Sequence, residues 1–442
     1  MQKKRVVVLD VVGLSLRHFE KRKNIPNLAS LLDNGRLSDM KSIFPAVTLP
    51  VQASITSGCY PEKHGIVANG FYQPESFQVS FWDQPASLVY ADRIWDRLKR
   101  KDSSLTTATL FMQNTLYSDC ECIITPKPMH TDEGLIQWCY SKPVGFYEQL
   151  CEELGEFSLR DYWGPMTSID SSRWIAKAAV ETMARIEPNL MFVYLPHLDY
   201  CTQKYGTNST KVEEELKQVD KEVGRIVQGV DDLGFKDQTT FIVLSEYEFY
   251  NVEGAIALNR ILRQAGFLRV RTIQNREYLD FELSFAFAMV DHQIAHIYIK
   301  PGYKKKVRSV LEKVEGINYL FDQSGKDSHR VNHERAGDII AVSSKNKWFS
   351  YYWWDDTFKE PDFAGNIDIH RKPGYDPLEL CFDHETKKIS QDTSLIKGSH
   401  GYPPSTDQDN LPFIVSGAAS DDVILPDDFC VTDVASLIDQ IL

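Results

Sequence analysis

An uninterrupted apolar run near the start of the chain, Val6-Val7-Val8-Leu9, ends on the carboxylate of Asp10 and limits the folds open to this sequence. Such a run is typical of a strand in a parallel sheet that is covered on both faces. Between Pro26 and Gly35 the apolar residues recur with helical spacing, and the glycine supplies a left-handed stop. A strand followed by a helix and a return to the sheet predicts a βαβ unit.

The same alternation of helices and strands returns in the middle of the chain. Helices are predicted at 174–186 and 212–233, and strands at 190–194 and 239–244. Polar residues follow these strands, at Asp199 and at Ser245-Glu246. In open α/β sheets, ligands bind beyond the carboxyl ends of the strands. We therefore expect the carboxylates of Asp10, Asp199 and Glu246 to gather at one edge of the sheet.

The sequence changes character near residue 281, where short alternating runs and a basic helix replace the longer helix and strand pattern. This change predicts an inserted α+β subdomain at 281–395. Residues 1–280 are then the first part of an α/β core. Residues 396–442 return to that core, with a strand near 412–415 and a closing helix at 431–442.

Composition sets limits on the partners of this chain. Its net charge of -13 at pH 7 argues against a protein that binds the phosphate backbone of a nucleic acid polymer. No stretch approaches the roughly 20 apolar residues that a membrane span needs, and the short N-terminal run carries Asp10, unlike a signal peptide. The scattered cysteines fit reduced thiols. We therefore expect a cytoplasmic protein with neither a nucleic acid polymer nor a membrane as partner.

A threonine stands where a helix is predicted to begin, in the segment Phe44-Pro45-Ala46-Val47-Thr48-Leu49-Pro50. Proline in the first helical turn costs no hydrogen bond, which supports a helix start at Thr48. The free N–H groups and the dipole of such a terminus favour an anion, so a phosphate or a developing alkoxide could bind there. An ordinary helix cap is the plainer interpretation of Thr-x-Pro alone. The carboxylates expected at the strand ends favour a site.

Longer motifs accompany this threonine. They are Val8-Leu9-Asp10, Pro26-Asn27-Leu28, Tyr60-Pro61-Glu62-Lys63-His64-Gly65-Ile66-Val67-Ala68-Asn69, Leu195-Pro196-His197-Leu198-Asp199 and Gly398-Ser399-His400-Gly401-Tyr402. Together with the threonine segment they resemble the alkaline phosphatase superfamily, and within it the nucleotide pyrophosphatase/phosphodiesterase branch. The resemblance implies an alkaline-phosphatase-like α/β sandwich with a mostly parallel central sheet, helices on both faces and an inserted α+β subdomain.

The resemblance also implies a reaction. In this family a threonine attacks phosphorus and forms a covalent phospho-threonine that water later releases, while two metals, usually zinc, hold the nucleophile and the phosphate oxygens. Thr48 corresponds to that nucleophile and, with Asp10, to the metal that activates it. Asp199 and His400 correspond to the second metal. By the same resemblance Glu246 is a metal ligand and Asn69 a substrate-binding residue.

Four residues depart from the family pattern, and one is Val51, where the family has an asparagine that donates to a phosphate oxygen. After the fourth strand the family has Ser-Asp-His, whereas this chain has Ser245-Glu246-Tyr247, and the histidine expected four residues after Asp199 is Gln203. Glutamate can bind a metal, but a tyrosine with a pKa of about 10 is a rare ligand. A neutral amide suits a hard cation better than zinc. We therefore expect two divalent metal ions, zinc by resemblance, with magnesium, manganese or calcium as alternatives because of Gln203 and Tyr247.

Histidines of the insert could replace those that are missing. The segment Asp291-His292-Gln293-Ile294-Ala295-His296 places two imidazoles four residues apart, where they would share a face of a strand or of a helix. Satisfied core or surface histidines explain the same spacing. His370 precedes a predicted turn and is a second candidate. The additional metal-ligand or neighbouring positions are therefore Gln203, Tyr247, His292, His296 and His370.

These residues predict a metal-dependent phosphohydrolase that resembles phosphodiesterases and nucleotide pyrophosphatases and uses a phospho-threonine on Thr48. Its expected partner is a small phosphorylated substrate, with nucleotides among the candidates. Two alternatives stay open. The chain could be a phosphomonoesterase or a phosphoryl transferase on a small metabolite, since another acceptor can intercept the same intermediate. It could also be a catalytically retired protein that binds a phosphorylated ligand, because Gln203 and Tyr247 have replaced family residues.

Overall fold

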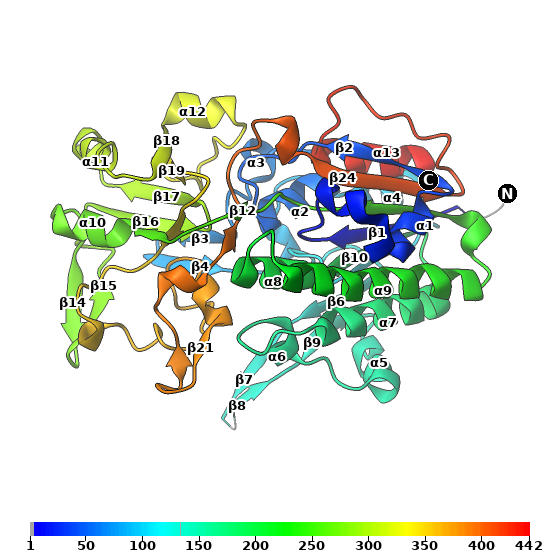
Figure 1. Ribbon diagram of the computed structural model, residues 1–442, viewed down its shortest axis with the longest axis horizontal. Coiled ribbons are helices and arrows are strands. Elements are labelled where there is room, and N and C mark those ends of the chain that lie inside the picture. Colours follow the sequence, from blue (N-terminus) through cyan, green and yellow to red (C-terminus); the bar gives the residue numbers. More distant parts are fainter. Residues whose placement is uncertain (1–3, 133) are drawn as a thin grey trace.

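A large, mostly parallel sheet forms the centre of the molecule in the computed structural model, which describes residues 4–132 and 134–442 (Figure 1). The order of its eight strands is β2-β24-β11-β1-β10-β5-β6-β9. Neighbours from β11 to β6 pair in parallel, whereas β24 and β9 pair antiparallel with the strands beside them. The bounds are β1 Arg5–Val11, β2 Gly35–Met40, β5 Thr107–Leu110, β6 Cys122–Pro126, β9 Cys139–Lys142, β10 Leu190–Leu195, β11 Thr239–Leu244 and β24 Leu411–Gly417.

The three central strands are the apolar runs that the sequence marks as parallel strands. Every residue of β1, β10 and β11 is buried. In register, Val8 of β1 lies between Phe192 of β10 and Ile242 of β11. Apolar side chains on both faces of a strand remain in contact with protein only if helices cover both faces. The predicted α/β fold class with a mostly parallel sheet is therefore confirmed.

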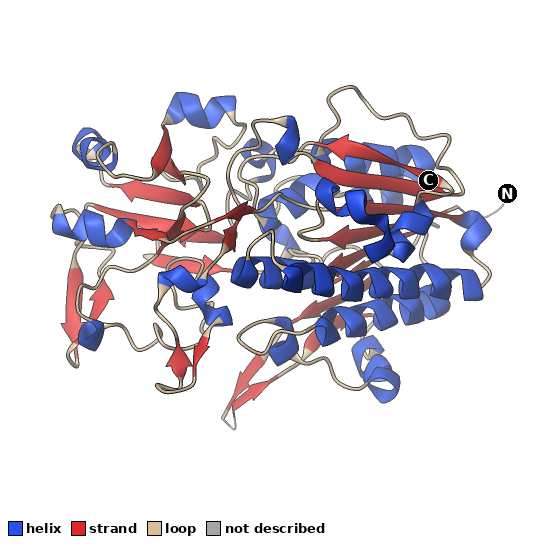
Figure 2. Cartoon of the chain, viewed as in Figure 1, coloured by secondary structure: helices blue, strands red, loops and turns tan. Residues whose placement is uncertain are grey.

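Helices cover the two faces of this sheet (Figure 2). The long helices α7 (Ile169–Ile186) and α9 (Thr210–Asp232) pack against each other on one face, together with α8 (His197–Tyr205) and α1 (Pro26–Leu31). On the other face lie α2 (Thr48–Ser57), α4 (Ile94–Lys101) and α13 (Val434–Ile441). The closing helix predicted at 431–442 begins with a short 3-10 turn, Val431–Asp433, and becomes α-helical only from Val434.

A second, antiparallel sheet forms the part of the molecule at the left of Figure 1. Its strand order is β16-β17-β19-β18, with the bounds β16 Ala286–Asp291, β17 Ile294–Ile299, β18 Ile317–Phe321 and β19 Ile339–Ser343. Helices α10 (Leu258–Gln264), α11 (Lys304–Leu311) and α12 (Gln323–Ser328) accompany it. This sheet has a hydrophobic cluster of its own. We keep the division of the chain at residues 281 and 395 as a proposal.

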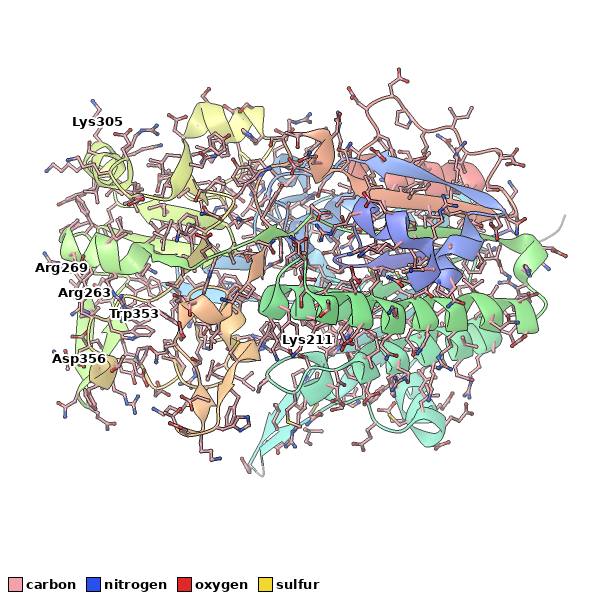
Figure 3. All side chains as sticks on the ribbon, viewed as in Figure 1. Lys211, Arg263, Arg269, Lys305, Trp353 and Asp356 are labelled. Carbon is pink, nitrogen blue, oxygen red and sulfur yellow. The ribbon has the colours of Figure 1, made fainter. Side chains whose placement is uncertain are left out.

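The aromatic run at 348–354 belongs to this second cluster. Only Trp348–Ser350 forms a strand, β20, and the rest of the run continues as buried loop. Trp353 is 1 % exposed, its indole N–H donates to the carbonyl of Glu277, and its own carbonyl accepts from Arg263 (Figure 3). The run is therefore structural.

The remaining elements are short. The helices are α3 Pro61–His64, α5 Phe146–Leu154 and α6 Leu159–Tyr162. The strand pairs are β3 Gly70–Gln73 with β4 Gln78–Phe81, β7 Met129–Thr131 with β8 Gly134–Ile136, β12 Tyr250–Asn251 with β23 Gly398–Ser399, β13 Ala255–Ala257 with β20, β14 Val270–Ile273 with β15 Arg276–Leu279, and β21 Phe382–Asp383 with β22 Lys388–Ile389. Across the described residues, no helix has the length and apolar character to span a membrane.

Candidate active site

Three carboxylates lie together where the central strands end. Asp10 is near the end of β1, Asp199 is in the first turn of α8 after β10, and Glu246 follows β11 by two residues. Because β10, β1 and β11 are adjacent and parallel, their carboxyl ends meet at the same edge of the sheet. The expected gathering of these three side chains is what the structure shows.

Thr48 faces this edge from the N-terminus of helix α2. Val47 precedes it in an extended conformation, and Thr48 is the first helical residue. The Thr48 hydroxyl lies 3.0 Å from the phenol oxygen of Tyr247. All ten residues of α2 are buried, so the positive end of the helix dipole acts in a medium that screens it little.

A chain of hydrogen bonds leads from Thr48 to the insert. The Tyr247 phenol donates to Asp199 Oδ1 at 3.1 Å, so the Thr48 hydroxyl is left to donate to Tyr247. Gln203 Nε2 donates to Asp199 Oδ2 at 2.8 Å, and the phenol of Tyr375 donates to Gln203 Oε1 at 2.9 Å. Burial raises the pKa of Asp199 to about 7 against the lowering effect of the bonds from Tyr247 and Gln203. Both oxygens of Asp199 therefore accept a hydrogen bond from another side chain of the protein.

Asp10 and Glu246 form a second group, joined by Gln52. The Gln52 amide nitrogen is 2.7 Å from Glu246 Oε1 and 3.5 Å from Asp10 Oδ2. Asp10 Oδ1 and Glu246 Oε2 are buried without a hydrogen-bond partner. Burial raises the pKa of Asp10 to about 7, and burial together with the charge of Asp10 holds the pKa of Glu246 well above its usual range. Two buried carboxylates with one unused oxygen each are a place for positive charge.

Four rings pack one on another in a row from Tyr247 to Tyr375. The ring of Tyr247 lies parallel to that of His400, at 3.6 Å and 3°. His292 follows at 3.7 Å from His400, and Tyr375 at 3.9 Å from His292. His400 Nδ1 donates to the carbonyl of Ala46 at 2.8 Å, and its Nε2 has no hydrogen-bond partner. Burial lowers the pKa of His400 to about 3, so the imidazole is neutral.

The predictions that His292 and His296 share a face and that His370 lies at the site are wrong. His292 and His296 do not share a face, because His292 sits in the turn between β16 and β17 with a φ of 58°. His296 Nε2 bonds to the carbonyl of Val67 and its Nδ1 accepts from the N–H of Gly337, so both nitrogens have structural partners. His370 is exposed on a loop. Of the three, the structure brings only His292 to the candidate site.

Asn69 lies beside the candidate nucleophile. Its Oδ1 accepts from the N–H of Leu49 at 2.9 Å, and its Nδ2 donates to Asp291 Oδ1 at 3.1 Å. The backbone N–H of Asn69 donates to the other oxygen of Asp291 at 2.8 Å. Strand β16 of the insert thus fixes the side chain at the N-terminus of α2, and one N–H of the amide remains for another acceptor.

Sequence reasoning missed Gln52 and Tyr375. Gln52 is on helix α2 itself, one turn after Thr48, so helical spacing could have placed it beside the nucleophile. Tyr375 is 172 residues from Gln203 along the chain, and no local pattern links the two. We call Asp10, Thr48, Asp199, Gln203, Glu246, Tyr247 and His400 the central cluster.

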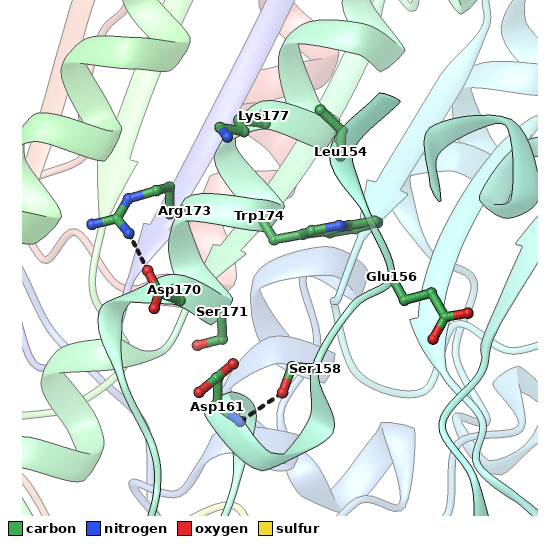
Figure 4. Close-up of a pocket in the computed structure, with 9 residues that line it drawn as sticks. All are labelled: Leu154, Glu156, Ser158, Asp161, Asp170, Ser171, Arg173, Trp174 and Lys177. Atoms are coloured by element: carbon green, nitrogen blue, oxygen red, sulfur yellow. Dashed lines mark hydrogen bonds and ion pairs between the residues drawn. The ribbon is translucent and has the colours of Figure 1, made fainter. Parts of the chain in front are cut away.

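The central cluster is closed to solvent. Its most exposed member, Asp199, has a fractional exposure of 6 %. A surface hollow of about 270 Å³ lies elsewhere, beside helix α7, where Trp174 forms a wall and Arg173 pairs with Asp170 (Figure 4). No member of the central cluster lines it.

The side chains of the central cluster fit a metal ion at Asp10 and Glu246 and do not fit one at Asp199. In the described part of the chain, no group of three or more His, Cys, Asp or Glu side chains is placed to hold a metal ion. Asp10 and Glu246 nevertheless offer two unused oxygens, joined by Gln52 of the same helix as Thr48, and magnesium is usually held by one or two carboxylates with water and substrate phosphate. Around Asp199 the oxygens already accept protein donors. A nitrogen-rich zinc pair is not what these residues provide.

The close approach of Gly398 to helix α8 gives a first prediction. A Cβ at Gly398 would lie 2.3 Å from the carbonyl oxygen of Thr202, so the substitution must push strand β23 away from the helix. That helix holds Asp199 and Gln203, and His400 follows the strand. We expect Gly398→Ala to cost about 1–3 kcal/mol of stability and to lower ligand binding at the site. Urea unfolding measures the first effect, and unchanged stability would contradict this close approach.

The buried carboxyl of Asp291 predicts a pH-dependent difference between wild type and Asp291→Asn. Burial raises the pKa of Asp291 to about 7, from about 3.9 in an unfolded chain. Its contribution to stability is therefore complete below about pH 4 and is lost as the pH rises through about 7. The variant lacks this loss, so from pH 5 to 7.5 it should gain about 2 kcal/mol relative to wild type. Urea unfolding of both proteins measures the difference, which must change with pH if this is right.

Buried carboxylates at the ends of adjacent parallel strands and a threonine at a helix N-terminus make up the candidate active site of this α/β fold. The chain belongs to the type I phosphodiesterase / nucleotide pyrophosphatase family, whose family model matches residues 6–376.

Among curated relatives, rat ectonucleotide pyrophosphatase/phosphodiesterase family member 1 is 25% identical over 231 residues, which are 50% of this chain and 21% of the relative. Mouse bis(5'-adenosyl)-triphosphatase is 25% identical over 52% of this chain and 44% of its own. Mouse ectonucleotide pyrophosphatase/phosphodiesterase family member 7 is 21% identical over 74% and 66%. The chain thus spans less than half of the length of the first two.

Solved structures share the fold. Murine ectonucleotide pyrophosphatase / phosphodiesterase 5, in complex with AMP, matches with a TM-score of 0.62 at 15% identity, over 99% of this chain and 94% of that one. Phosphonoacetate hydrolase from Sinorhizobium meliloti 1021 matches with a TM-score of 0.65 at 14% identity, over 100% and 96%. At these identities the similarity establishes the architecture, and the chemistry has to be argued from the site.

Proposed function

We propose that this protein is a phosphohydrolase that cleaves a phosphoric ester or phosphoanhydride bond of a small phosphorylated compound, with Thr48 as nucleophile. The observation that carries the proposal is the Thr48 hydroxyl at the N-terminus of the buried helix α2, one turn before Gln52, whose amide joins the carboxylates of Asp10 and Glu246. Relatives named as phosphodiesterases, pyrophosphatases and a bis(5'-adenosyl)-triphosphatase support it, as does the AMP complex of a structural neighbour. A nucleotide is therefore the first substrate to try.

The residues have separate roles in this proposal. Thr48 Oγ1 gives up its proton and attacks phosphorus, the bond from phosphorus to the leaving oxygen breaks, that oxygen takes up a proton, and a phospho-threonine forms. Water then attacks that phosphorus, the bond to Oγ1 breaks, and the threonine regains its hydroxyl proton. The helix α2 dipole and the unused N–H of Asn69 favour the negative charge of the phosphoryl group.

A cation has a place in this reaction. Asp10 and Glu246 would hold it, since each has a buried oxygen without a partner. Bound there, a hard divalent cation would stabilise the alkoxide of the nucleophile and neutralise charge on phosphate. Oxygen ligands favour magnesium or manganese over zinc.

The test is the hydrolysis of p-nitrophenyl phosphate, a monoester, and bis-p-nitrophenyl phosphate, a diester. Protein freed of metal by chelator is supplied separately with magnesium, manganese, calcium or zinc. We expect cation-dependent turnover with magnesium or manganese, with the diester cleaved faster, as the family name implies. Absence of turnover of both esters and of a dinucleoside polyphosphate under all four cations would contradict the proposal.

A second candidate function is the binding of a phosphorylated ligand without turnover. It is favoured by the bond that already engages the Thr48 hydroxyl with Tyr247 and by the burial of the central cluster. Calorimetric titration with AMP separates the two functions. Saturable binding by a protein that turns over no ester would favour this candidate.

A further inference from the structure

The two halves of the central cluster differ in whether a cation could bind. We infer that this site takes one divalent cation, held by Asp10 and Glu246, and that Tyr247 occupies the place of a second. Residues of the insert, Tyr375 foremost, hold Tyr247 there through Gln203 and Asp199. The inference uses the proposed function only to say what the cation serves, because the number of bound cations can be measured without turnover.

Asp199 is the residue around which a second cation would have to bind. Its Oδ1 accepts the phenol proton of Tyr247 at 3.1 Å, and its Oδ2 accepts from Gln203 at 2.8 Å. The Gln203 oxygen, which could have faced a cation, accepts from Tyr375 at 2.9 Å instead. Proton donors thus point at both oxygens of the carboxylate and at the oxygen of the amide. Each of these oxygens keeps a further lone pair, so a cation would have to share its ligands with these donors, and Gln203 supplies an amide where a zinc site has an imidazole.

Tyr247 also fills the space between the nucleophile and this carboxylate. Its oxygen is 3.0 Å from Thr48 Oγ1 and 3.1 Å from Asp199 Oδ1, so a cation bound to Asp199 could reach a phosphoryl group on Thr48 only by displacing it. A phenol oxygen is a poor substitute for an imidazole ligand.

Tyr247 has little freedom to move aside. One face of its ring packs on His400 at 3.6 Å, and His292 and Tyr375 continue the stack into the insert. Trp163 and Trp82 pack against Tyr375 at 5.8 and 6.2 Å. Close packing makes the displacement of one ring costly, since its neighbours must move with it.

The other half of the cluster keeps what a cation needs. Asp10 Oδ1 and Glu246 Oε2 are buried and unpartnered, and among the described residues neither carboxylate forms an ion pair with Lys or Arg. The other buried polar atom of the cluster without a hydrogen-bond partner is His400 Nε2, which lies 3.6 Å from Asp199 Oδ1. One nitrogen and one carboxylate that already accepts two protein donors fall short of the three or four protein ligands of a zinc site.

Counting bound cations tests the inference. The full chain is freed of metal by chelator, dialysed against manganese, and analysed for manganese and protein. We expect one equivalent, which Asp10→Asn removes and Asp199→Asn leaves in place. These two substitutions are matched, because both replace a buried carboxylate of the central cluster with the amide of the same size.

A gain-of-ligand variant gives a second measurement. The double substitution Tyr247→His and Gln203→His removes the phenol and supplies two imidazoles, so it should raise the zinc content from one equivalent to two. Two equivalents in the wild-type protein, or a single equivalent lost with Asp199→Asn and kept with Asp10→Asn, would overturn the inference. If the double variant does not fold, the wild-type count and the matched pair still decide. One equivalent of bound metal in a protein that shows no turnover would support this inference and contradict the proposed function.

Discussion

Thr48→Ala is expected to lower the turnover of bis-p-nitrophenyl phosphate by at least about 1,000-fold. Alanine has no oxygen to bond to phosphorus, so the covalent intermediate cannot form. The Thr48 side chain is 3 % exposed and bonds to Tyr247, so the fold loses one hydrogen bond worth about 1 kcal/mol. The rate at saturating cation, with circular dichroism to show that the variant is folded, measures the effect.

Two further variants isolate the chemical role of this hydroxyl. Thr48→Ser keeps an attacking oxygen and should stay within about 10-fold of wild type. Thr182→Ala removes another fully buried threonine hydroxyl, on helix α7 outside the central cluster, and should leave turnover intact. Turnover of Thr48→Ala equal to that of Thr182→Ala would contradict a nucleophilic role.

Glu246→Gln is the change with the second largest expected effect. It removes a carboxylate oxygen that is buried without a partner and halves the negative charge that Asp10 and Glu246 can present. We expect manganese affinity and cation-dependent turnover both to fall by at least about 100-fold. Calorimetric titration with manganese and the hydrolysis rate measure the two effects separately.

The matched control is Glu246→Asp, which keeps the charge and shortens the side chain by one methylene. It should retain manganese binding within about 10-fold, because Gln52 can still donate to the carboxylate. If Glu246→Gln and Glu246→Asp bind manganese equally well, the charge of this residue is not what holds the cation.

The core of the fold and part of the site follow from local sequence patterns. Strands β1, β10 and β11 are apolar runs with short-range signals, and parallel pairing then forces their carboxyl ends to one edge. That topology is why the sequence alone is enough to expect Asp10, Asp199 and Glu246 to meet. The position of Thr48 at a helix start depends equally on local chemistry, namely the proline two residues later.

The contacts that decide the chemistry of the site depend on distant residues. Tyr375 reaches Gln203 across 172 residues, and His292 reaches His400 only because the turn between β16 and β17 presents its ring to the core. The expected pairing of His292 with His296 failed for the same reason, since the spacing assumed a continuous strand or helix. Side-chain partners set by tertiary packing leave no periodic signal in the sequence.

The proposed reaction depends most directly on a covalent bond between Thr48 and the substrate phosphorus. We would mix the protein with manganese and bis-p-nitrophenyl phosphate, quench with acid during steady turnover, and measure the intact mass and the peptide that contains Thr48. The proposed reaction predicts an added nitrophenyl-phosphoryl or phosphoryl group on Thr48 that disappears after the substrate is exhausted. Steady turnover with an adduct on another residue, or with unmodified Thr48 under conditions where release is shown to be slow, would contradict it.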